Sequence, residues 1–296
     1  MTALILKYKN IIVEDKKLLG NILIFMAAIF TAVVSIFVKG LSAEVPAPYI
    51  TFARFFVGFL YVFIGQKIGK IEKTVNNRKN LLIFGVFGAS AATFFFLAIS
   101  ADMVGRATLL NSLQPVFSAI FAMLLFKEKT PKLVWVFAIL SFFGVYLVTS
   151  PSLSNINIGI IYGLITGVMA GLAVMYMNIA RRTETTSITF LYFCKAGMVF
   201  SLIMCLKTTA LPPASALLYL LIMGIFSTIA QLLATYAYKY TSATEGGIVF
   251  MSQIFFAMLL GYIVFGETLS SKGIVGAILI LISGGLVTWL RRNPCK

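Results

Sequence analysis

Residues 114–128 read QPVFSAIFAMLLFKE and residues 253–267 read QIFFAMLLGYIVFGE, so a Gln, several Phe and a Glu recur after a shift of 139 residues, from 114 to 253. A second pair, ITFARFF from Ile50 and ITFLYFC from Ile188, is shifted by 138 residues. Two matches in the same order predict two halves of similar length that descend from one unit. The polar stretch 150–157, SPSLSNIN, is typical of a linker between them.

Composition indicates that lipid is the solvent of this chain. Of its 296 residues, 60% are hydrophobic and only 11% are charged, and the mean hydropathy is +1.00. One soluble core cannot bury so large an apolar fraction. We expect helices, because lipid offers the backbone no hydrogen bonds and the apolar runs lack the alternation of barrel strands. The predicted fold class is therefore an all-α polytopic membrane protein.

Ten stretches have about the 20 residues that a helix needs to cross the hydrocarbon. They are 18–39, 48–66, 80–101, 103–126, 133–149, 158–180, 187–206, 214–239, 244–265 and 272–290. Each copy holds five spans, and an odd number inverts the second copy in the bilayer. We predict two inverted five-helix repeats, 18–149 and 158–290, between an N-terminal segment 1–17 and a tail 291–296. Duplication for packing alone is the alternative.

The placement of basic residues predicts the orientation of the chain. Its formal net charge of +15 could suggest a nucleic-acid partner, but the loops are too short to build a basic face. If the N-terminus is cytoplasmic, all but six of the 24 Lys and Arg fall on the inner side. The six are Lys39, Arg106, Lys207 and Lys272 near the outer side, and Arg54 and Lys195 within spans. This bias predicts a protein of the inner (cytoplasmic) membrane with both termini cytoplasmic.

The sequence offers few of the side-chain combinations that enzymes and metalloproteins use for catalysis or metal binding. The chain has no histidine, and its three cysteines are poorly placed for a bridge. Cys194 and Cys205 lie about 16 Å apart along one helix, and Cys295 lies in the tail. Paired acids at mid-membrane and a nucleophile with a base are also missing. We therefore expect no catalytic residue, no metal site and no cofactor.

The nine acids lie in loops, in the N-terminal segment or near helix ends. Since no carboxylate falls convincingly at mid-membrane, neither a proton relay nor a sodium site is evident. Asp102 and Arg106 are four residues apart and are expected to form a local ion pair at the outer mouth. We expect the repeat-related Glu128 and Glu267 to organise turns rather than bind ions.

Amide side chains at mid-depth form the best candidate site. Pro115 has no amide hydrogen, so it leaves the carbonyl of Asn111 without a helical partner and is expected to kink its helix. The repeat places a second glutamine at a matching depth in the other half. The predicted substrate-binding set is Asn111, Gln114, Gln253, Gln231 and Thr31, together with Tyr176 and Tyr236. For any single member, interhelical hydrogen bonding worth about 0.6 kcal/mol is the alternative.

Three cations are candidates for gating or for charge recognition. Arg54 and Lys195 lie within spans, where a central charge costs about 2.5–3.5 kcal/mol. Arg54 could contact substrate, form a gating ion pair, or anchor to backbone carbonyls or headgroups. A functional role is favoured for the deeper Lys195, and Lys39 is the third candidate. The excess of buried cations over buried anions hints at a solute with a carboxylate or phosphate.

Aromatic and glycine residues add two further predictions. Tyr176 and Tyr236 could line a cavity for an amphipathic or aromatic solute, although such rings more often face lipid or neighbouring helices. Gly163, Gly167 and Gly171 recur every four residues and so share one helix face. Such a stripe lets another backbone come close, which favours tight packing over substrate contact.

The order of short runs along nearly the whole chain resembles the EamA-type transporters of the drug/metabolite transporter superfamily. The runs are Phe37-Val38-Lys39, Pro46, Arg54, Ala107 through Asn111, Gln114-Pro115, Phe126-Lys127-Glu128, Thr130, 144–148, Tyr236-Ala237-Tyr238, Gln253, Phe265-Gly266-Glu267 and Gly284-Gly285. The resemblance implies a carrier of small metabolites whose central cavity is lined chiefly by the first, third, fourth, sixth, eighth and ninth helices. Arg54 and Pro115 correspond to Tyr192 and Ile254 in the second half, so the halves are chemically unequal.

These observations favour a secondary transporter that moves a small polar or amphipathic metabolite, such as an amino acid or a related compound, by alternating access. We expect a monomer or homodimer whose partners are the small-molecule substrate and the lipid bilayer, with no nucleic acid. Flipping of a lipid or a polyisoprenyl lipid is the alternative and would need a side opening between helices. An intramembrane enzyme is disfavoured.

Overall fold

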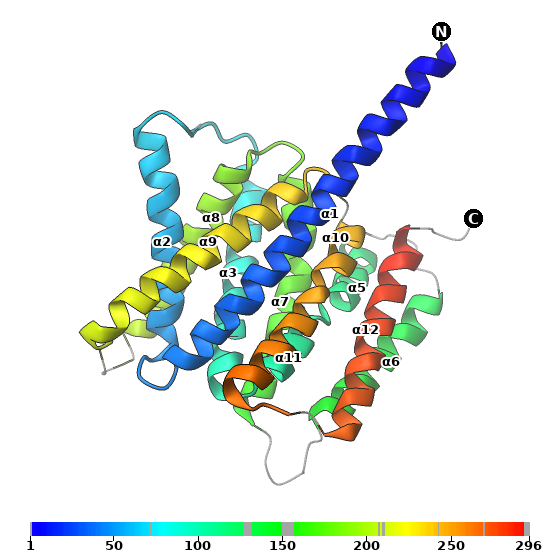
Figure 1. Cartoon of the computed structure of the whole chain (residues 1–296). Helices are drawn as coiled ribbons and strands as arrows, with labels where there is room; N and C mark the ends of the chain where they lie inside the picture. Colours follow the sequence, from blue (N-terminus) through cyan, green and yellow to red (C-terminus); the bar gives the residue numbers. More distant parts are fainter. Residues whose placement is uncertain are drawn as a thin grey trace.

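The computed structural model describes residues 2–71, 73–126, 132–149, 157–206, 208, 211–241, 243–268 and 270–292, and these residues form helices and turns without a strand (Figure 1). The helices are α1 (Thr2–Leu41), α2 (Ala47–Lys67), α3 (Arg78–Ala101), α4 (Val104–Asn111), α5 (Gln114–Phe126), α6 (Lys132–Thr149), α7 (Ile158–Ala180), α8 (Thr186–Cys205), the short 3-10 helix η1 (Ala214–Ala216), α9 (Leu217–Ala237), α10 (Ala243–Phe250), α11 (Ser252–Phe265) and α12 (Ser271–Arg292). The prediction of an all-α fold is confirmed. Most of the expected linker, and Glu128, lie outside the described residues.

Seven segments of the described chain are long and apolar enough to cross a membrane. They are Leu18–Leu41, Ala47–Lys67, Arg78–Ala101, Val104–Leu125, Ile158–Ala180, Thr186–Cys205 and Ala214–Ala237. Three shorter apolar helices are Trp135–Gly144, Ser252–Phe265 and Ser271–Ser283. The chain is therefore a multi-pass helical membrane protein. Its first helix runs from Thr2 to Leu41, across the expected boundary between segment 1–17 and the first span.

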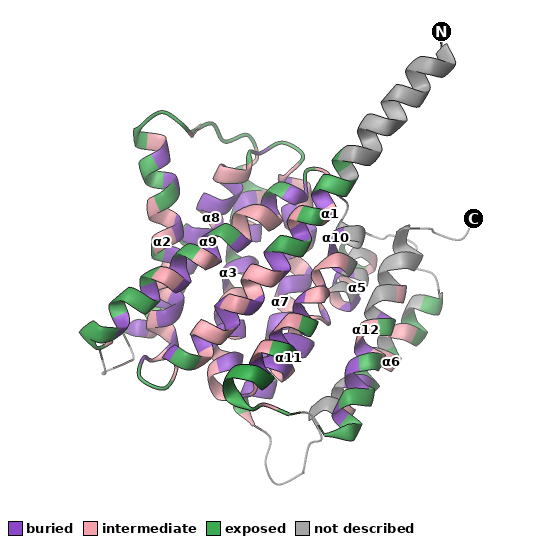
Figure 2. Cartoon of the chain, in the orientation of Figure 1, coloured by how far each residue is buried: buried purple, intermediate pink, exposed green. Residues whose placement is uncertain are grey.

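The outer surface of the bundle is apolar, as a lipid-facing surface requires. Ile139, Ile263 and Leu218 are 69%, 65% and 62% exposed, and many other large apolar side chains are exposed with them. Buried residues gather in the interior around α3 and α7, while exposed ones lie on the outward sides of the helices (Figure 2). This distribution agrees with a bundle whose solvent is hydrocarbon.

Two of the expected spans are each divided into two helices. α4 and α5 are separated by Ser112 and Leu113, and α10 and α11 are separated by Met251. Both joins contain hydrogen bonds between residues three apart, as in a 3-10 helix. The N–H of Leu113 donates to Leu110 O over 3.2 Å, and the N–H of Ile254 donates to Met251 O over 3.0 Å.

The first join directly precedes Pro115, as the expected kink requires, but the second does not depend on a proline. Ile254 occupies the corresponding place, and the helix is still divided one turn earlier. The difference between Pro115 and Ile254 therefore does not lead to a different backbone course in the two halves. A divided helix at this depth is a property that both share.

The two halves pack against each other in reciprocal pairs. α1 packs on α9 and α3 packs on α7, and these pairs exchange when each helix is replaced by its repeat-related partner. α4 and α5 pack on α7, while α10 and α11 pack on α1. α2 pairs with α8, and α6 pairs with α12 at one edge of the bundle (Figure 1). Each half thus completes the interior of the other.

The glycine stripe of α7 permits its close approach to the join between α4 and α5. A Cβ atom added to Gly167 would lie 2.9 Å from the carbonyl oxygen of Leu110, and one added to Gly171 would lie 2.8 Å from Cβ of Phe117. A side chain at either position would meet atoms that belong to or adjoin the backbone. The predicted role of the stripe in tight packing is confirmed.

Candidate binding cavity

A cavity of about 150 Å³ lies between the two halves, where the divided helices end. Its polar lining comprises Thr31, Arg54, Asn111, Gln114, Thr166, Ser227, Gln231 and Gln253. Five of the seven predicted substrate-binding residues are therefore brought together, without Tyr176 and Tyr236, and Arg54 joins them. A cavity of this size accommodates a molecule about as large as benzene.

The helix joins explain why amides meet at this depth. Asn111 is the last residue of α4, Gln114 is the first of α5, and Gln253 is the second of α11. Helix ends leave backbone groups without intrahelical partners, and divided transmembrane helices use such ends to bind solutes. A smaller void of about 20 Å³, also lined by these three residues, adjoins both joins and has room for a water molecule.

Gln253 is the most deeply buried of these amides, with 1% of its surface exposed. Its Nε2 has no hydrogen-bond partner among the residues that the structure describes. A buried donor left without a partner costs about 1–3 kcal/mol. A bound solute or water that accepts this hydrogen bond would remove that cost.

Arg54 reaches the cavity from α2 and meets α9. Its Nη2 donates to Oε1 of Gln231 over 3.3 Å, and its Cζ lies 5.7, 5.1 and 5.6 Å from the ring centroids of Phe55, Phe96 and Phe193. The amide of Gln231 also contacts the hydroxyl of Thr235, over 3.5 Å. The guanidinium is thus held by rings and by a neutral amide.

The six helices that the resemblance implied all line the cavity, with two additions. These six correspond to α1, α3, α4 with α5, α7, α9, and α10 with α11. α2 contributes Arg54 and α8 contributes Phe193.

Tyr238 lines the cavity, and the predicted Tyr236 does not. Tyr236 is 41% exposed and its hydroxyl contacts that of Tyr240 over 2.9 Å. Gln231, Ala234 and Tyr238 are spaced by three and four residues and share a helix face that excludes Tyr236. That spacing, measured from Gln231, is the signal that could have identified Tyr238.

Three other candidates lie away from the cavity. Tyr176 does not line it. Lys195 is exposed on α8, and its Nζ lies 5.9 Å from the ring centroid of Tyr192. Lys39 lies at the end of α1, where its Nζ donates to the backbone oxygen of Asp102 over 2.6 Å.

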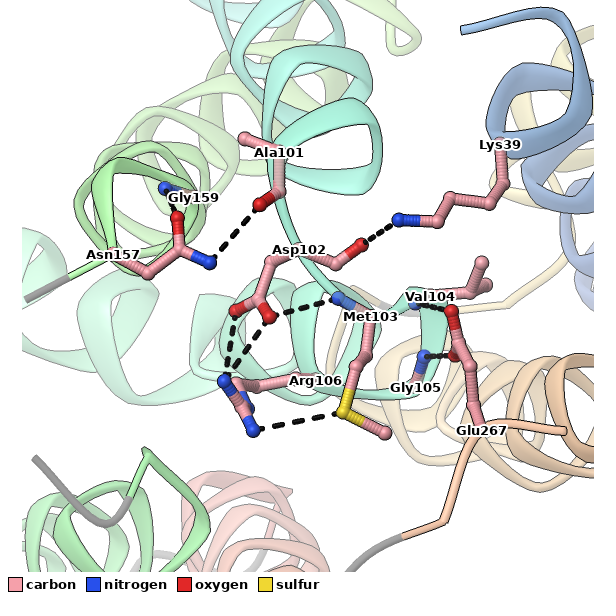
Figure 3. Close-up of polar contacts among 10 residues, drawn as sticks. All are labelled: Lys39, Ala101, Asp102, Met103, Val104, Gly105, Arg106, Asn157, Gly159 and Glu267. Atoms are coloured by element: carbon pink, nitrogen blue, oxygen red, sulfur yellow. Dashed lines mark hydrogen bonds and ion pairs between the residues drawn. The ribbon is translucent and has the colours of Figure 1, made fainter. Parts of the chain in front are cut away.

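A polar cluster, formed by Lys39, Asp102, Arg106, Asn157 and Glu267, ties five helices together at one end of the bundle (Figure 3). Nη1 of Arg106 lies 3.0 Å from Oδ1 of Asp102, which confirms the predicted local ion pair. Nδ2 of Asn157 donates to Ala101 O over 3.0 Å, and its Oδ1 accepts from the N–H of Gly159 over 2.9 Å. This end of the bundle is closed by contacts between elements far apart in sequence.

Glu267 has a role in this cluster that sequence reasoning missed. Its Oε1 accepts from the N–H of Val104 over 3.0 Å, and its Oε2 accepts from that of Gly105 over 3.4 Å. The carboxylate therefore caps α4 from the end of α11, rather than only organising its own turn. A negative group at a helix N-terminus satisfies unpaired N–H groups and is favoured by the helix dipole.

The cavity extends from mid-depth toward the opposite end of the bundle. Its lining includes Tyr238, just beyond the end of α9, and Met177, three residues before the end of α7. At that end Oε1 of Glu184 accepts from the N–H of Asn76 over 2.8 Å. Burial lowers the pKa of the nearby Arg181 below its ordinary value, with the guanidinium donating to Glu184 O.

Comparison with known proteins finds transporters. The protein-family model described as the EamA-like transporter family matches residues 18–150 and again 157–289. The pseudopaline exporter CntI of Pseudomonas aeruginosa is 27% identical over 268 residues, which cover 89% of this chain and 94% of that protein. An uncharacterised transporter of Archaeoglobus fulgidus is 26% identical, with 91% and 96% covered. Solute carrier family 35 member G1 of Homo sapiens is 25% identical, with 90% and 77% covered.

A solved structure shares the fold. It superposes with a TM-score of 0.64 at 18% identity, and the match covers 96% of this chain and 99% of the other. At this identity the likeness concerns the fold alone.

Proposed function

Because the chain belongs to the EamA-like transporter family, we propose that it is a secondary transporter that moves a small polar or amphipathic metabolite across the inner (cytoplasmic) membrane by alternating access. An amino acid or a related compound is the proposed solute class. The observation that carries the proposal is the cavity between the halves, where Asn111, Gln114 and Gln253 meet at the helix joins. Such a site at a repeat interface is the arrangement that secondary transporters use.

The proposed architecture is ten spans in two inverted repeats, 18–149 and 158–290. α4 with α5, and α10 with α11, each make one divided span. The reciprocal pairing of α1 with α9 and of α3 with α7 supports this arrangement, since an exchange of halves preserves the contacts.

The proposed state is open toward the cytoplasm. The polar cluster closes one end of the bundle, and the cavity approaches the other, where Arg181, Arg182 and Lys239 lie. Basic residues favour the cytoplasmic side, so this end would face inward and both termini would be cytoplasmic. Opening of the polar cluster, with closure near Tyr238, would expose the cavity to the other side.

Transport is tested with purified protein reconstituted in proteoliposomes. A panel of amino acids, nucleotides and amphipathic drugs is offered in uptake and efflux modes, and export is tested first because a similar protein is named a pseudopaline exporter. Saturable movement of at least one solute is expected. Failure of every solute to move through folded protein in both directions would contradict the proposal.

Lipid or polyisoprenyl-lipid flipping is the second candidate, and one observation favours it. An apolar groove of about 440 Å³ lies between α11 and α12 and includes Met251, at the join of a divided helix. Fluorescent-lipid scrambling in the same vesicles separates the two functions: scrambling without solute movement would favour flipping.

A further inference from the structure

Arg54 alone carries a formal charge among the described side chains that line the cavity. It lies in the interior of α2, eight residues into a helix of 21, and it is half-buried. A cation in this position faces little water, so its interactions with other charges are strong.

The surroundings fix the guanidinium without neutralising it. The rings of Phe55, Phe96 and Phe193 attract a cation through their π faces, with Cζ to centroid distances of 5.1–5.7 Å. Gln231 accepts one hydrogen bond but contributes no charge. Arginine has five N–H donors, and this arrangement leaves donors for a further acceptor.

The acids whose side chains the structure describes are engaged elsewhere or lie away from the cavity. Asp102 pairs with Arg106, Glu184 accepts from Asn76, and Glu267 caps α4. None of these acids lines the cavity, and neither does Glu44. A gating ion pair between Arg54 and an acid with a described side chain would need one of these four.

The anchoring role considered for Arg54 also disagrees with its direction. An anchor would extend toward headgroups or carbonyls at the membrane surface, whereas this side chain lines the cavity and contacts α9. Lys195 provides the contrast, because it is an exposed cation within a span that does not line the cavity.

We propose that Arg54 binds an anionic oxygen group of the transported solute, with the unpartnered Nε2 of Gln253 as a second donor on the cavity wall. This inference rests on the transport function proposed above and specifies its substrate class. A carboxylate fits the two parallel donors of a guanidinium, and a phosphate or phosphonate presents the same chemistry. The volume of about 150 Å³ restricts the group that enters this state to a compact one.

The test compares fragments that match in shape and differ in charge. Full-length protein in lipid nanodiscs is titrated with benzoate, benzamide and phenylphosphonate, and the midpoint of thermal unfolding is followed. The variants are Arg54→Gln, which removes the charge, and Arg54→Lys, which retains the charge but loses the paired donors. Lys195→Gln is the matched control, because it removes an intramembrane cation outside the cavity.

Benzoate is expected to raise the unfolding midpoint of the wild type and of Lys195→Gln, and benzamide is expected to have a much smaller effect. Arg54→Gln should weaken benzoate binding about tenfold or more, with Arg54→Lys intermediate. A stronger effect of phenylphosphonate than of benzoate would support the anion site and assign it to phosphate-like solutes.

Two outcomes would overturn the anion site. One is equal stabilisation of the wild type by benzoate and benzamide. The other is undiminished benzoate binding by Arg54→Gln. Both readouts are independent of transport. Arg54-dependent binding without movement of any solute would support the anion site and contradict the proposed transport function. Transport of neutral solutes that is unaffected by Arg54→Gln would support the transport function and contradict the anion site.

Discussion

Single side chains at the helix joins carry the proposed recognition. Gln114 and Gln253 occupy repeat-related positions in the two halves, Asn111 lies beside Gln114 at its join, and Nε2 of Gln253 lacks a partner within the described chain. A donor in this state is available to a solute. Removal of the Gln253 amide should therefore affect transport more than stability.

Gln253→Ala and Asn111→Ala are each expected to lower kcat/KM for the transported solute at least fivefold, since one hydrogen bond is worth about 1 kcal/mol or more. Tyr236→Phe is the control, because Tyr236 is exposed and lies away from the cavity. Initial rates in proteoliposomes, with expression and unfolding midpoint measured in parallel, provide the test. Unchanged kinetics in both alanine variants would reject the site.

Much of the cavity could be predicted at the scale of residues. Polar side chains are scarce at mid-depth in an apolar chain, so Asn111, Gln114, Gln231 and Gln253 could be selected from the sequence. Tyr238 and Lys195 show where this reasoning fails. Whether a ring or a cation on a helix faces a neighbour or lipid depends on the rotation of that helix, which an apolar sequence with little amphipathic pattern does not specify.

Helix ends and helix contacts determine the geometry of the cavity. The glycine stripe of α7 allows close contact with the α4–α5 join, and Glu267 caps α4 at its other end. Both the glycine stripe and the cap can be tested by a substitution that has a matched control elsewhere in the chain.

Gly167→Ala should lower stability by about 1–3 kcal/mol, because the added Cβ would lie 2.9 Å from the carbonyl oxygen of Leu110. Alanine is intrinsically the better helix former by about 1 kcal/mol, so the sign of the change distinguishes contact from propensity. At Gly40 in α1 an added Cβ would meet nothing within 4 Å, and Gly40→Ala should be neutral or stabilising. Unfolding midpoints in one detergent provide the comparison. A stabilised Gly167→Ala variant would contradict the described packing.

Glu267→Ala is expected to destabilise the protein by about 1 kcal/mol, because the N–H groups of Val104 and Gly105 lose their acceptor. Glu267→Gln should cost less, since an amide oxygen still accepts a hydrogen bond. Glu44→Ala is the control: this acid is exposed in the turn between α1 and α2. Denaturation curves would show the order, and equal effects of Glu267→Ala and Glu44→Ala would exclude the cap.

The sequence predicted most of the helices but not their joins. Length and hydropathy locate an apolar segment, and Pro115 gave a reason for a break in the first half. Nothing comparable marks Met251, where α10 and α11 separate. That break lies within tertiary contacts, with α10 and α11 both packed on α1, and such contacts override local propensity. Glu267 likewise caps residues that are 162 and 163 positions away in the sequence, and a local sequence pattern cannot predict such a contact.

At the scale of the whole molecule, the reciprocal packing of the two halves is the feature on which the proposed alternation between two arrangements of one cavity depends. Pairs such as α1 with α9 and α3 with α7 exchange under the repeat, so under the proposed inversion an arrangement closed at one end would have a counterpart closed at the other. The polar cluster and the position of the cavity assign the described arrangement to one of the two. The 139-residue shift in the sequence predicted the duplication, whereas the end that is closed here depends on contacts such as Glu267 with α4.

Alternating access to the cavity is tested most directly by labelling a cysteine within it from each side of the membrane. Ala92 lines the cavity at mid-length of α3, so Ala92→Cys is made in a chain whose Cys194, Cys205 and Cys295 are replaced. A membrane-impermeant maleimide is applied to right-side-out and to inside-out vesicles. We predict labelling from both sides, faster from the cytoplasmic side, and slowed on both by any solute that the protein moves. Labelling confined to one side in transport-competent vesicles would contradict alternating access through this cavity.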